Sequence, residues 1–315
     1  MKLEIPLLTS AIIGFWGAEA APLTSTASQQ AIEWSVSYQG HTIFEYSFAP
    51  QKFKPYVKVL ATVDGFNLLR DAPSDHLHHH ALMYGIKVNG INFWEEVSGS
   101  GIQKPVNTDA PKFDTNPQGQ PRATLHQTVH WLSPADAWLP DTTKLALLVE
   151  ERTLKLTVNE KSREVALEWE SVFTVGTKTN EVGLTGSSYH GLGMRFVQTL
   201  DPLARHFNAD GPPDLSNGKQ DVSPHRWASV SFEPAGHPAT IAVLGDPNNT
   251  RGNPKFFTML TPFAYLSATQ GLDKEPLIYH TGQQFSLRYL VVVYPELKSP
   301  ASLDARGQSW SNPPP

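Results

Sequence analysis

The stretch from Val165 to Val175 reads VALEWESVFTV, and its side chains alternate in character along the chain. In an extended chain successive side chains point to opposite faces. One face carries Val165, Leu167, Trp169, Ser171, Phe173 and Val175, and the other carries Ala166, Glu168, Glu170, Val172 and Thr174. An apolar face opposite a more polar one predicts a half-buried β-strand.

Shorter stretches with the same two-residue period recur along the chain. They cover residues 31–38, 41–48, 56–63, 145–149, 153–158, 228–232, 239–244 and 285–293. Gln39-Gly40, between the first two, is typical of a tight hairpin turn. No stretch keeps the 3.6-residue period of an amphipathic helix with end caps. We therefore predict an all-β fold, a sandwich or a barrel.

Three stretches lack this alternation. Residues 104–121 and 208–224 are polar and rich in Pro, Gly, Asn and Asp, which predicts long loops. Residues 299–315 are expected to form an irregular tail. Between the N-terminal leader and this tail, residues 21–298 are expected to form a single β domain.

The composition excludes several classes of site. The chain has 315 residues, a formal net charge of −5 and no cysteine. Without cysteine there are no disulfides, no thiolate metal sites and no cysteine nucleophile. The mildly acidic balance argues against nucleic acid as a partner, because phosphate binding needs clustered Lys and Arg.

The N-terminus is typical of an export signal. Lys2 precedes an apolar run, and Ala18-Glu19-Ala20 offers small residues at the two positions that signal peptidase needs. We expect cleavage near Ala20 and export to the periplasm or the cell exterior. A buried N-terminal helix is the alternative. No later apolar run approaches the roughly 20 residues of a membrane span.

Histidines crowd into one short stretch, Asp75-His76-Leu77-His78-His79-His80. If this stretch is extended, His76, His78 and His80 face one side. Imidazoles titrate near neutral pH and can act as bases, acids or metal ligands. Asp75 could orient one ring by accepting its second N–H. The spacing matches no standard zinc motif, and a solvated loop is the alternative interpretation of each single histidine.

Other stretches add candidate binding residues. Trp94 follows an Asn-Gly turn, and His190 and Arg195 flank two glycines that allow a ligand to approach the backbone. Arg195 offers a fork of N–H donors for oxygen anions or hydroxyl groups. A bulged strand with a structural ion pair explains His190 and Arg195 equally well, and a hairpin with an anchoring tryptophan is the alternative for Trp94. Glu168 and Glu170 share a strand face, where a solvated surface is favoured over a catalytic carboxylate pair. The sequence has no phosphate-binding glycine loop and no nucleophile elbow.

A family resemblance rests on motifs that run in one order along the chain. They are Pro55-Tyr56-Val57, Asp75-His76, His79-His80, the run from Gly85 to Trp94, the run from Gly191 to Arg195, Arg226-Trp227, the run from Ile241 to Pro254, and the run from Gly282 to Tyr289. Together they resemble a secreted bacterial family that is labelled methane oxygenase PmoA. The resemblance covers about residues 55–295, and His78 and His190 stand where the family has other residues.

The resemblance implies a fold and a setting. It implies a large antiparallel β-sandwich like the galactose-mutarotase supersandwich, and a role in exported sugar catabolism. Particulate methane monooxygenase subunits span the membrane, whereas this chain has no span beyond its leader. The oxygenase label is therefore not carried over.

Three functional hypotheses follow. The first is a carbohydrate-active enzyme, an epimerase, lyase or hydrolase, in which His79 or His80 is the acid or base and Asp75 or His76 orients it. Arg195 would stabilise an oxyanion, and the substrate-binding residues would be Trp94, His190, Trp227 and Arg251. The second is a non-catalytic glycan-binding module. The third is a histidine-based site for a divalent metal, although no cofactor is predicted, and the oligomeric state stays open.

Overall fold

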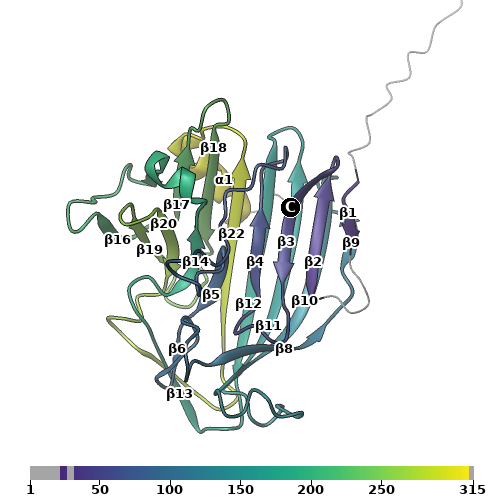
Figure 1. The fold of residues 1–315 in the computed structure, drawn as a ribbon, viewed down its shortest axis with the longest axis vertical. Coiled ribbons are helices and arrows are strands. Elements are labelled where there is room, and N and C mark those ends of the chain that lie inside the picture. Colours follow the sequence, from purple (N-terminus) through teal and green to yellow (C-terminus); the bar gives the residue numbers. More distant parts are fainter. Residues whose placement is uncertain (1–21, 27–31, 312–315) are drawn as a thin grey trace, which may run out of the picture.

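Two large antiparallel sheets pack face to face in the computed structural model, which describes residues 22–26 and 32–311 (Figure 1). The first sheet contains, in spatial order, β1 (Thr24–Thr26), β2 (Glu33–Tyr38), β3 (His41–Ser47), β4 (Tyr56–Leu60), β5 (Leu82–Gly85), β14 (Gly191–Arg195), β20 (Tyr265–Thr269), β19 (Lys255–Met259) and β16 (Gln220–Pro224). Its strand pairs are antiparallel.

The second sheet faces the first across the main core. It contains β15 (Arg205–Asn208), β17 (Trp227–Phe232), β18 (Ala239–Gly245), β22 (Gln284–Tyr294), β12 (Glu164–Val175), β11 (Leu148–Asn159), β10 (Pro121–Leu132) and β8 (Ile102–Thr108), with β9 (Lys112–Thr115) also paired to β10. A small third sheet joins β21 (Leu277–His280), β13 (Glu181–Thr185), β6 (Lys87–Val88) and β7 (Ile91–Asn92). A short 3-10 helix, η1 (Gln198–Leu203), follows β14.

The predicted all-β sandwich is confirmed, and β12 shows why the sequence indicated it. Val165, Leu167, Trp169 and Phe173 of this strand are buried in the main core between the two sheets. The Gln39-Gly40 hairpin turn is also found, with both residues at positive φ between β2 and β3.

The core contains a buried ion pair that the alternation of apolar and polar residues in the sequence does not predict. The stretches 145–149 and 153–158 were expected to be separate, but the end of the first and the whole of the second belong to the single strand β11, which runs through the charged residues between them. Arg152 and Glu150 point inward and are fully buried, with Arg152 Nε 2.8 Å and Nη2 2.9 Å from the two carboxylate oxygens. Arg152 also donates to the Tyr46 hydroxyl at 2.9 Å. Each charge is tolerated because the other satisfies it.

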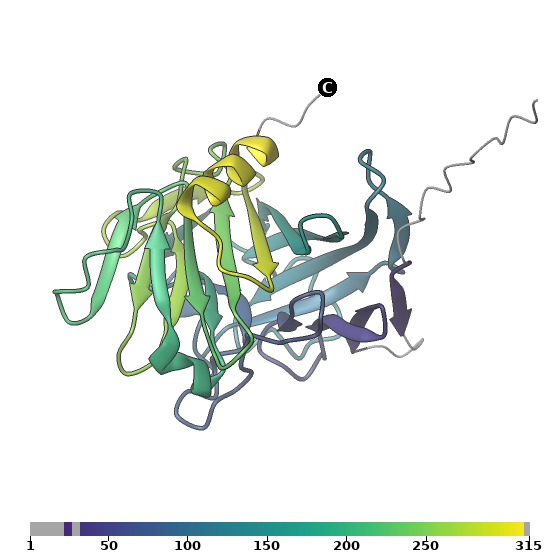
Figure 2. The ribbon, with the colours of Figure 1, turned by 90° about the horizontal axis from the view of Figure 1, so that it is seen from above.

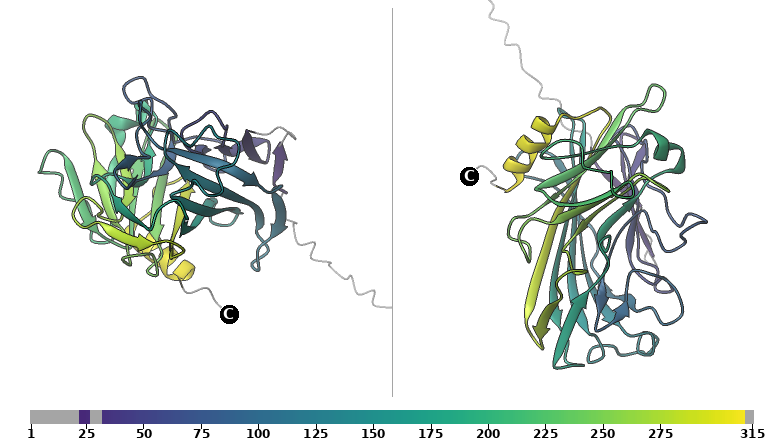
Figure 3. Two further views of the ribbon diagram at one scale, coloured as in Figure 1. Left: turned by 90° about the horizontal axis from the view of Figure 1, so that it is seen from below. Right: turned by 90° about the vertical axis from the view of Figure 1, so that its left-hand side faces the viewer.

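The C-terminal segment is ordered, and the expectation of an irregular tail for residues 299–315 is wrong over most of its length. The helix α1 (Pro300–Ser311) lies on the outer side of the second sheet (Figure 2). A side view places α1 and the purple strands β2 and β3 on opposite sides of the molecule (Figure 3). Leu303 and Trp310 of α1 are buried against Trp227, Leu290 and other residues of the outer face. Burying that face stabilises a helix whose own sequence shows little amphipathic pattern.

Two expected loops also contain strands. Residues 104–121 include most of β8 and the whole of β9, and residues 208–224 end in β16. The polar side chains stay exposed because these strands lie at sheet edges, as β16 does in the first sheet. The predicted signal, residues 1–20, lies outside the described residues. Within the described part of the chain, no helix has the length and apolar character of a membrane span.

Candidate functional site

The histidine-rich stretch folds as two consecutive turns on the outer face of the first sheet. His76 donates its backbone N–H to Pro73 O at 2.9 Å, and His79 donates to His76 O at 2.9 Å. The stretch is closed at its base by an isolated bridge between Asp71 and His80. Turns bring residues three apart onto one side, so His76 stacks on His79 with ring centroids 4.7 Å apart. The extended arrangement, with His76, His78 and His80 on one side, is therefore not formed.

Beneath these turns, a patch of the sheet is made flat by glycine. Gly193 lies in β14 between β5 and β20. A Cβ at this position would lie 1.9 Å from Tyr265 Oη and 2.7 Å from the Trp94 ring. Both aromatic side chains therefore rest directly on the glycine backbone. This is the close approach for which glycine is needed.

The rings around this patch form a continuous aromatic layer. Trp94 stacks on His190 at 5.1 Å between centroids and meets the edge of His79 at 6.1 Å. His79 also contacts Tyr265 and Phe263, each at 5.7 Å. The guanidinium carbon of Arg195 lies 3.3 Å from the centroid of Phe263, a cation–π contact.

Several polar atoms of this layer are buried without a hydrogen-bond partner in the described part of the chain. They are Trp94 Nε1, His79 Nδ1, both ring nitrogens of His190, Nε and Nη1 of Arg195, and Tyr265 Oη. We call these five residues the unpartnered cluster. Buried polar groups in folded proteins are nearly always hydrogen-bonded, so a group of orphaned atoms on one patch indicates a place for a ligand or ordered water.

The two histidines of the unpartnered cluster are neutral at pH 7. Burial lowers the pKa of His79 to about 3, and the neighbouring His78, His76 and Arg195 add to this effect. Burial likewise lowers the pKa of His190 to about 3, with smaller contributions from Lys87 and His78. A neutral imidazole has a lone pair that can accept a proton or a hydrogen bond.

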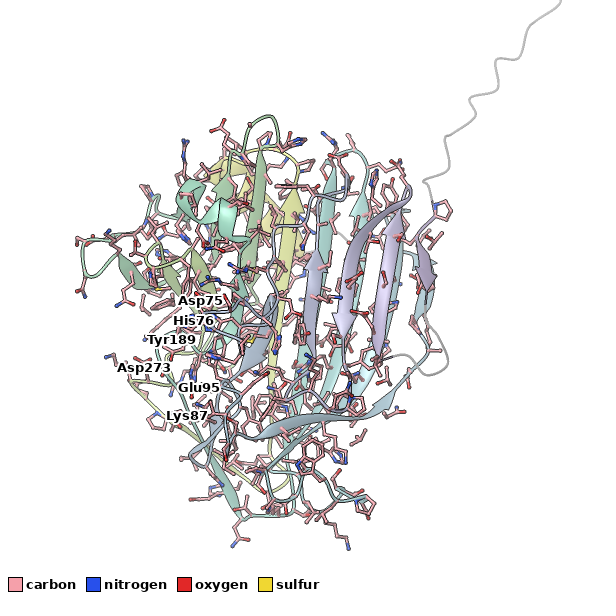
Figure 4. The ribbon with its side chains drawn as sticks, in the orientation of Figure 1. Asp75, His76, Lys87, Glu95, Tyr189 and Asp273 are labelled. Atoms are coloured by element: carbon pink, nitrogen blue, oxygen red, sulfur yellow. The ribbon has the colours of Figure 1, made fainter. Side chains whose placement is uncertain are left out.

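Asp75 connects the histidine turns to Arg195. Its Oδ2 lies 3.2 Å from Arg195 Nη2 and 3.2 Å from His76 Nδ1. Asp75 is exposed, whereas Arg195 is almost fully buried. Figure 4 labels Asp75, His76 and Tyr189 on the same side of the molecule, with Glu95 and Lys87 below them. These residues come from separate segments, so the more exposed rim of the site is assembled by the fold.

His80 faces away from this cluster into an ionic network. Its Nδ1 lies 2.6 Å from Asp71 Oδ1 and its Nε2 lies 3.0 Å from Glu96 Oε1. Burial lowers the pKa of His80, but the two carboxylates raise it more, so the net pKa lies above the ordinary value. Lys54, fully buried, pairs with Glu96 at 2.7 Å. Nδ1 is hydrogen-bonded to Asp71, whereas Nε2 lies at ion-pair distance from Glu96 without the geometry of a hydrogen bond, so His80 is held between two carboxylates.

The structure brings together most of the residues that the sequence singled out. Asp75, His76, His79, Arg195, Trp94 and His190 are linked by the contacts described above. Phe263 and Tyr265, which complete the aromatic layer, were not predicted from the sequence. Their only sequence signal is a pair of aromatics that flank Ala264 after a Thr-Pro turn.

Two predicted substrate-binding residues lie elsewhere. Trp227 is buried under α1, where its Nε1 donates to Asp304 at 2.8 Å, so its ring has no free face for a sugar. Arg251 lines a separate cavity near the ends of β19 and β20. Among residues 22–26 and 32–311, no group of three or more His, Asp or Glu side chains is arranged to hold a metal ion.

The fold and the site together define an all-β sandwich protein with a buried imidazole–guanidinium cluster on one outer face. The chain belongs to the family described as a family of unknown function, DUF6807, whose model matches residues 33–307. No curated protein matches the chain.

One solved structure shares the fold at low sequence identity, and a second is similar to a lesser degree. The GH36 α-galactosidase AgaB from Geobacillus stearothermophilus has a TM-score of 0.51 and 12% identity, over 87% of this chain and 41% of that chain. The galactosidase domain of the α-galactosidase–sucrose kinase AgaSK has a TM-score of 0.47 and 12% identity, over 87% of this chain and 42% of that one. The chain thus spans about two fifths of the galactosidases that it matches.

Proposed function

We propose that the protein is a carbohydrate-active enzyme in which neutral His79 accepts a proton and Arg195 stabilises the negative charge that develops on the substrate. The observation that carries this proposal is the unpartnered cluster, which presents base, cation and hydrogen-bonding groups on one patch. The aromatic layer around it suits the apolar faces of a sugar ring.

The charges of the unpartnered cluster support a reaction in which proton transfer to His79 is coupled to charge development beside Arg195. In the free protein Arg195 helps to keep His79 neutral, because two adjacent positive charges repel. An oxyanion that forms beside Arg195 would cancel that repulsion and stabilise the imidazolium. Proton transfer from a substrate carbon to His79 and charge development on the neighbouring oxygen therefore favour each other. This chemistry fits epimerisation or elimination beside a carbonyl group.

A two-carboxylate hydrolytic mechanism fits these residues less well. Glycosidases of that type need one carboxyl group that is protonated to act as an acid. Burial raises the pKa of Glu96, but His80 and Lys54 lower it more, to about 2, so this carboxyl group is ionised. Asp75 is held by Arg195 and His76. Neither carboxylate is therefore suited to donate a proton.

His80 has a different role in this proposal from that of His79. It positions the base, because its hydrogen bond to Asp71 and its ion pair with Glu96 fix the end of the turn that carries His79. The likeness in fold to a GH36 α-galactosidase agrees with a sugar ligand. Export and membership of the sugar-related PmoA-labelled family are parts of the same proposal and rest on the N-terminal leader and the ordered motifs.

Deuterium exchange tests the proton transfer directly, because a proton that leaves a substrate carbon is replaced by deuterium from the solvent. The product need not be identified. The full chain is incubated in D₂O with a panel of aldoses, ketoses and methyl glycosides, and loss of carbon-bound protons is followed by NMR. We expect exchange with at least one sugar and a loss of about 100-fold or more in His79→Asn. His126→Asn, an exposed histidine on β10, serves as the matched control. Unchanged exchange in His79→Asn would refute the role of His79.

A glycan-binding module is the second candidate, and the aromatic layer favours it. It predicts sugar binding that survives in His79→Asn, with no exchange and no product by mass spectrometry. Wild-type exchange with any sugar in the panel excludes this candidate.

A further inference from the structure

A second cavity lies apart from the unpartnered cluster. Its volume is about 290 Å³, and it is bounded by the ends of β19 and β20, by β22 and by the segment 249–255. The lining residues that matter here are Arg251, Lys255, Thr269, Gln270, Leu287 and Tyr289. This volume is close to the lower end of the range for small-molecule sites.

Two buried side chains on the cavity wall have polar atoms without a partner in the described part of the chain. They are Gln270 Nε2 and Tyr289 Oη. Gln270 is 6% exposed and Tyr289 is 1% exposed. The Gln270 amide is fixed in orientation because its Oε1 accepts a hydrogen bond from Tyr84 at 2.9 Å, which leaves its NH₂ group free to donate. Such fixed, unused donors favour a ligand with hydroxyl or carboxylate oxygens.

The cavity also has an excess of positive charge. Arg251 is held in place by Gln270 O at 3.3 Å and Pro276 O at 3.2 Å. Lys255 extends across Gly271, where a Cβ would lie 3.1 Å from its Nζ, and forms no ion pair within the described residues. Glu275, an acid on the cavity wall, is 3.7 Å from Arg251 and 80% exposed, so it offsets little of this charge.

We propose that this cavity binds a small sugar acid, with its carboxylate between Arg251 and Lys255 and its hydroxyl groups on Gln270 and Tyr289. The two cations supply the charge for the carboxylate, and Arg251 can bind it through two parallel bonds. The amide and the phenol supply donors at fixed positions for hydroxyl oxygens. The site is formed by residues other than those proposed for catalysis, so it does not depend on the proposed function.

Calorimetry on the full chain tests the site with sodium D-glucuronate as the probe. D-glucose, acetate and inorganic phosphate test the carboxylate, the hydroxyl groups and simple anion binding separately. We expect glucuronate to bind more tightly than each of the three. Arg251→Gln should raise the Kd for glucuronate about tenfold or more, because it removes the charge and the fork of N–H donors. Tyr289→Phe, which removes only the unpartnered hydroxyl, should raise it severalfold.

Matched variants separate this cavity from other cationic positions. Lys274→Gln changes a lysine of the neighbouring loop that is 79% exposed, and Arg195→Gln changes the unpartnered cluster. Lys274→Gln should leave the Kd for glucuronate unchanged, Arg251→Gln should weaken binding more than Arg195→Gln does, and thermal unfolding shows whether each variant is folded. No binding of glucuronate, equal binding of phosphate or glucose, or loss of binding in Arg195→Gln but not in Arg251→Gln would each overturn the proposal.

Discussion

His80 Nδ1 lies 2.6 Å from Oδ1 of Asp71, and this contact joins the last histidine of the turn-forming stretch to the residue nine positions before it. The Tyr56 hydroxyl donates to the other Asp71 oxygen at 2.9 Å, and its ring stacks on His80 at 4.1 Å. Both ends of the stretch are therefore fixed by one ionic contact.

The first prediction concerns the effect of this contact on stability. The contacts that raise the pKa of His80 also stabilise the fold. This stabilisation is fully present below pH 6.5, the ordinary pKa of histidine, and is lost as the pH rises through the folded-state pKa. His80→Asn removes the imidazolium partner of two half-buried carboxylates, which then keep Tyr56 and Lys54 as partners, so we expect it to lower the free energy of unfolding by about 2 kcal/mol at pH 5.5. The loss should be smaller at pH 9. Urea denaturation at both pH values measures it, with His126→Asn as the control.

The carboxylate partners of His80, Asp71 and Glu96, determine the pH below which this stabilisation is lost. Burial raises the pKa of Glu96 and Asp71, but their hydrogen bonds and ion pairs lower both more, that of Glu96 to about 2. Their stabilisation is present above the ordinary values of 4.5 and 3.8 and is lost as pH falls towards the folded-state values. Equal destabilisation by His80→Asn at pH 5.5 and pH 9 would contradict this account.

The second prediction is that neutral buried histidines make the protein sensitive to acid. His190 has a folded-state pKa of about 3 and an ordinary value of 6.5, so the unfolded chain binds its proton first. Stability is therefore full above pH 6.5 and falls as pH decreases, by about 1.4 kcal/mol per pH unit for each such group. His190→Gln should reduce the slope of unfolding free energy between pH 6 and pH 4 by about one proton. A slope equal to that of the wild type would show that His190 is protonated in the folded state.

How much of this site the sequence could predict depends on whether its geometry is local. The alternation in β12 depends only on neighbouring residues, so the sequence alone predicts this strand. The sequence does not predict the conformation of the histidine stretch, because its two turns are held by non-local contacts such as Ala81 N to Arg70 O and the bridge from Asp71 to His80. Those contacts replace a two-residue spacing by a three-residue spacing, which pairs His76 with His79.

Contacts between distant parts of the chain also explain why the predictions for Trp227 and the C-terminal segment were wrong. Trp227 and Arg226 both contact Asp304 of α1, a residue 77 positions away from Trp227. Only Leu303 and Trp310 of α1 are buried, and two residues are too few to give the sequence the hydrophobic period of a helix. The inward ion pair of Glu150 and Arg152 was also hidden, because charged residues ordinarily indicate solvent.

The third prediction concerns the flat glycine patch. Gly193→Ala places a methyl group 1.9 Å from Tyr265 Oη and so must displace Tyr265 and Trp94. We expect a loss of about 1–3 kcal/mol in the free energy of unfolding, together with a changed near-UV circular dichroism signal. Gly183→Ala on β13 is the control, because its new methyl group meets only ordinary contacts of 3.6 Å or more.

A double variant identifies the atom responsible. Tyr265 Oη has no partner in the described part of the chain, so Tyr265→Phe removes the clashing oxygen without breaking a hydrogen bond. Gly193→Ala combined with Tyr265→Phe should recover part of the lost stability. If the two effects simply add, the displaced group is another residue of the patch.

The fourth prediction separates the anchoring of α1 from the proposed sugar site. Asp304 accepts from Trp227 Nε1 at 2.8 Å and from Arg226 Nη2 at 2.9 Å, so Asp304→Ala leaves a buried indole N–H without its acceptor. We expect this variant to lose about 1–3 kcal/mol of stability and to raise hydrogen exchange in α1. Asp304→Asn keeps an acceptor oxygen and should lose less. Because Trp227 lies under α1 and not in the unpartnered cluster, sugar binding by Asp304→Ala should equal that of the wild type. A weakened sugar affinity in a folded Asp304→Ala protein would restore Trp227 as a binding residue.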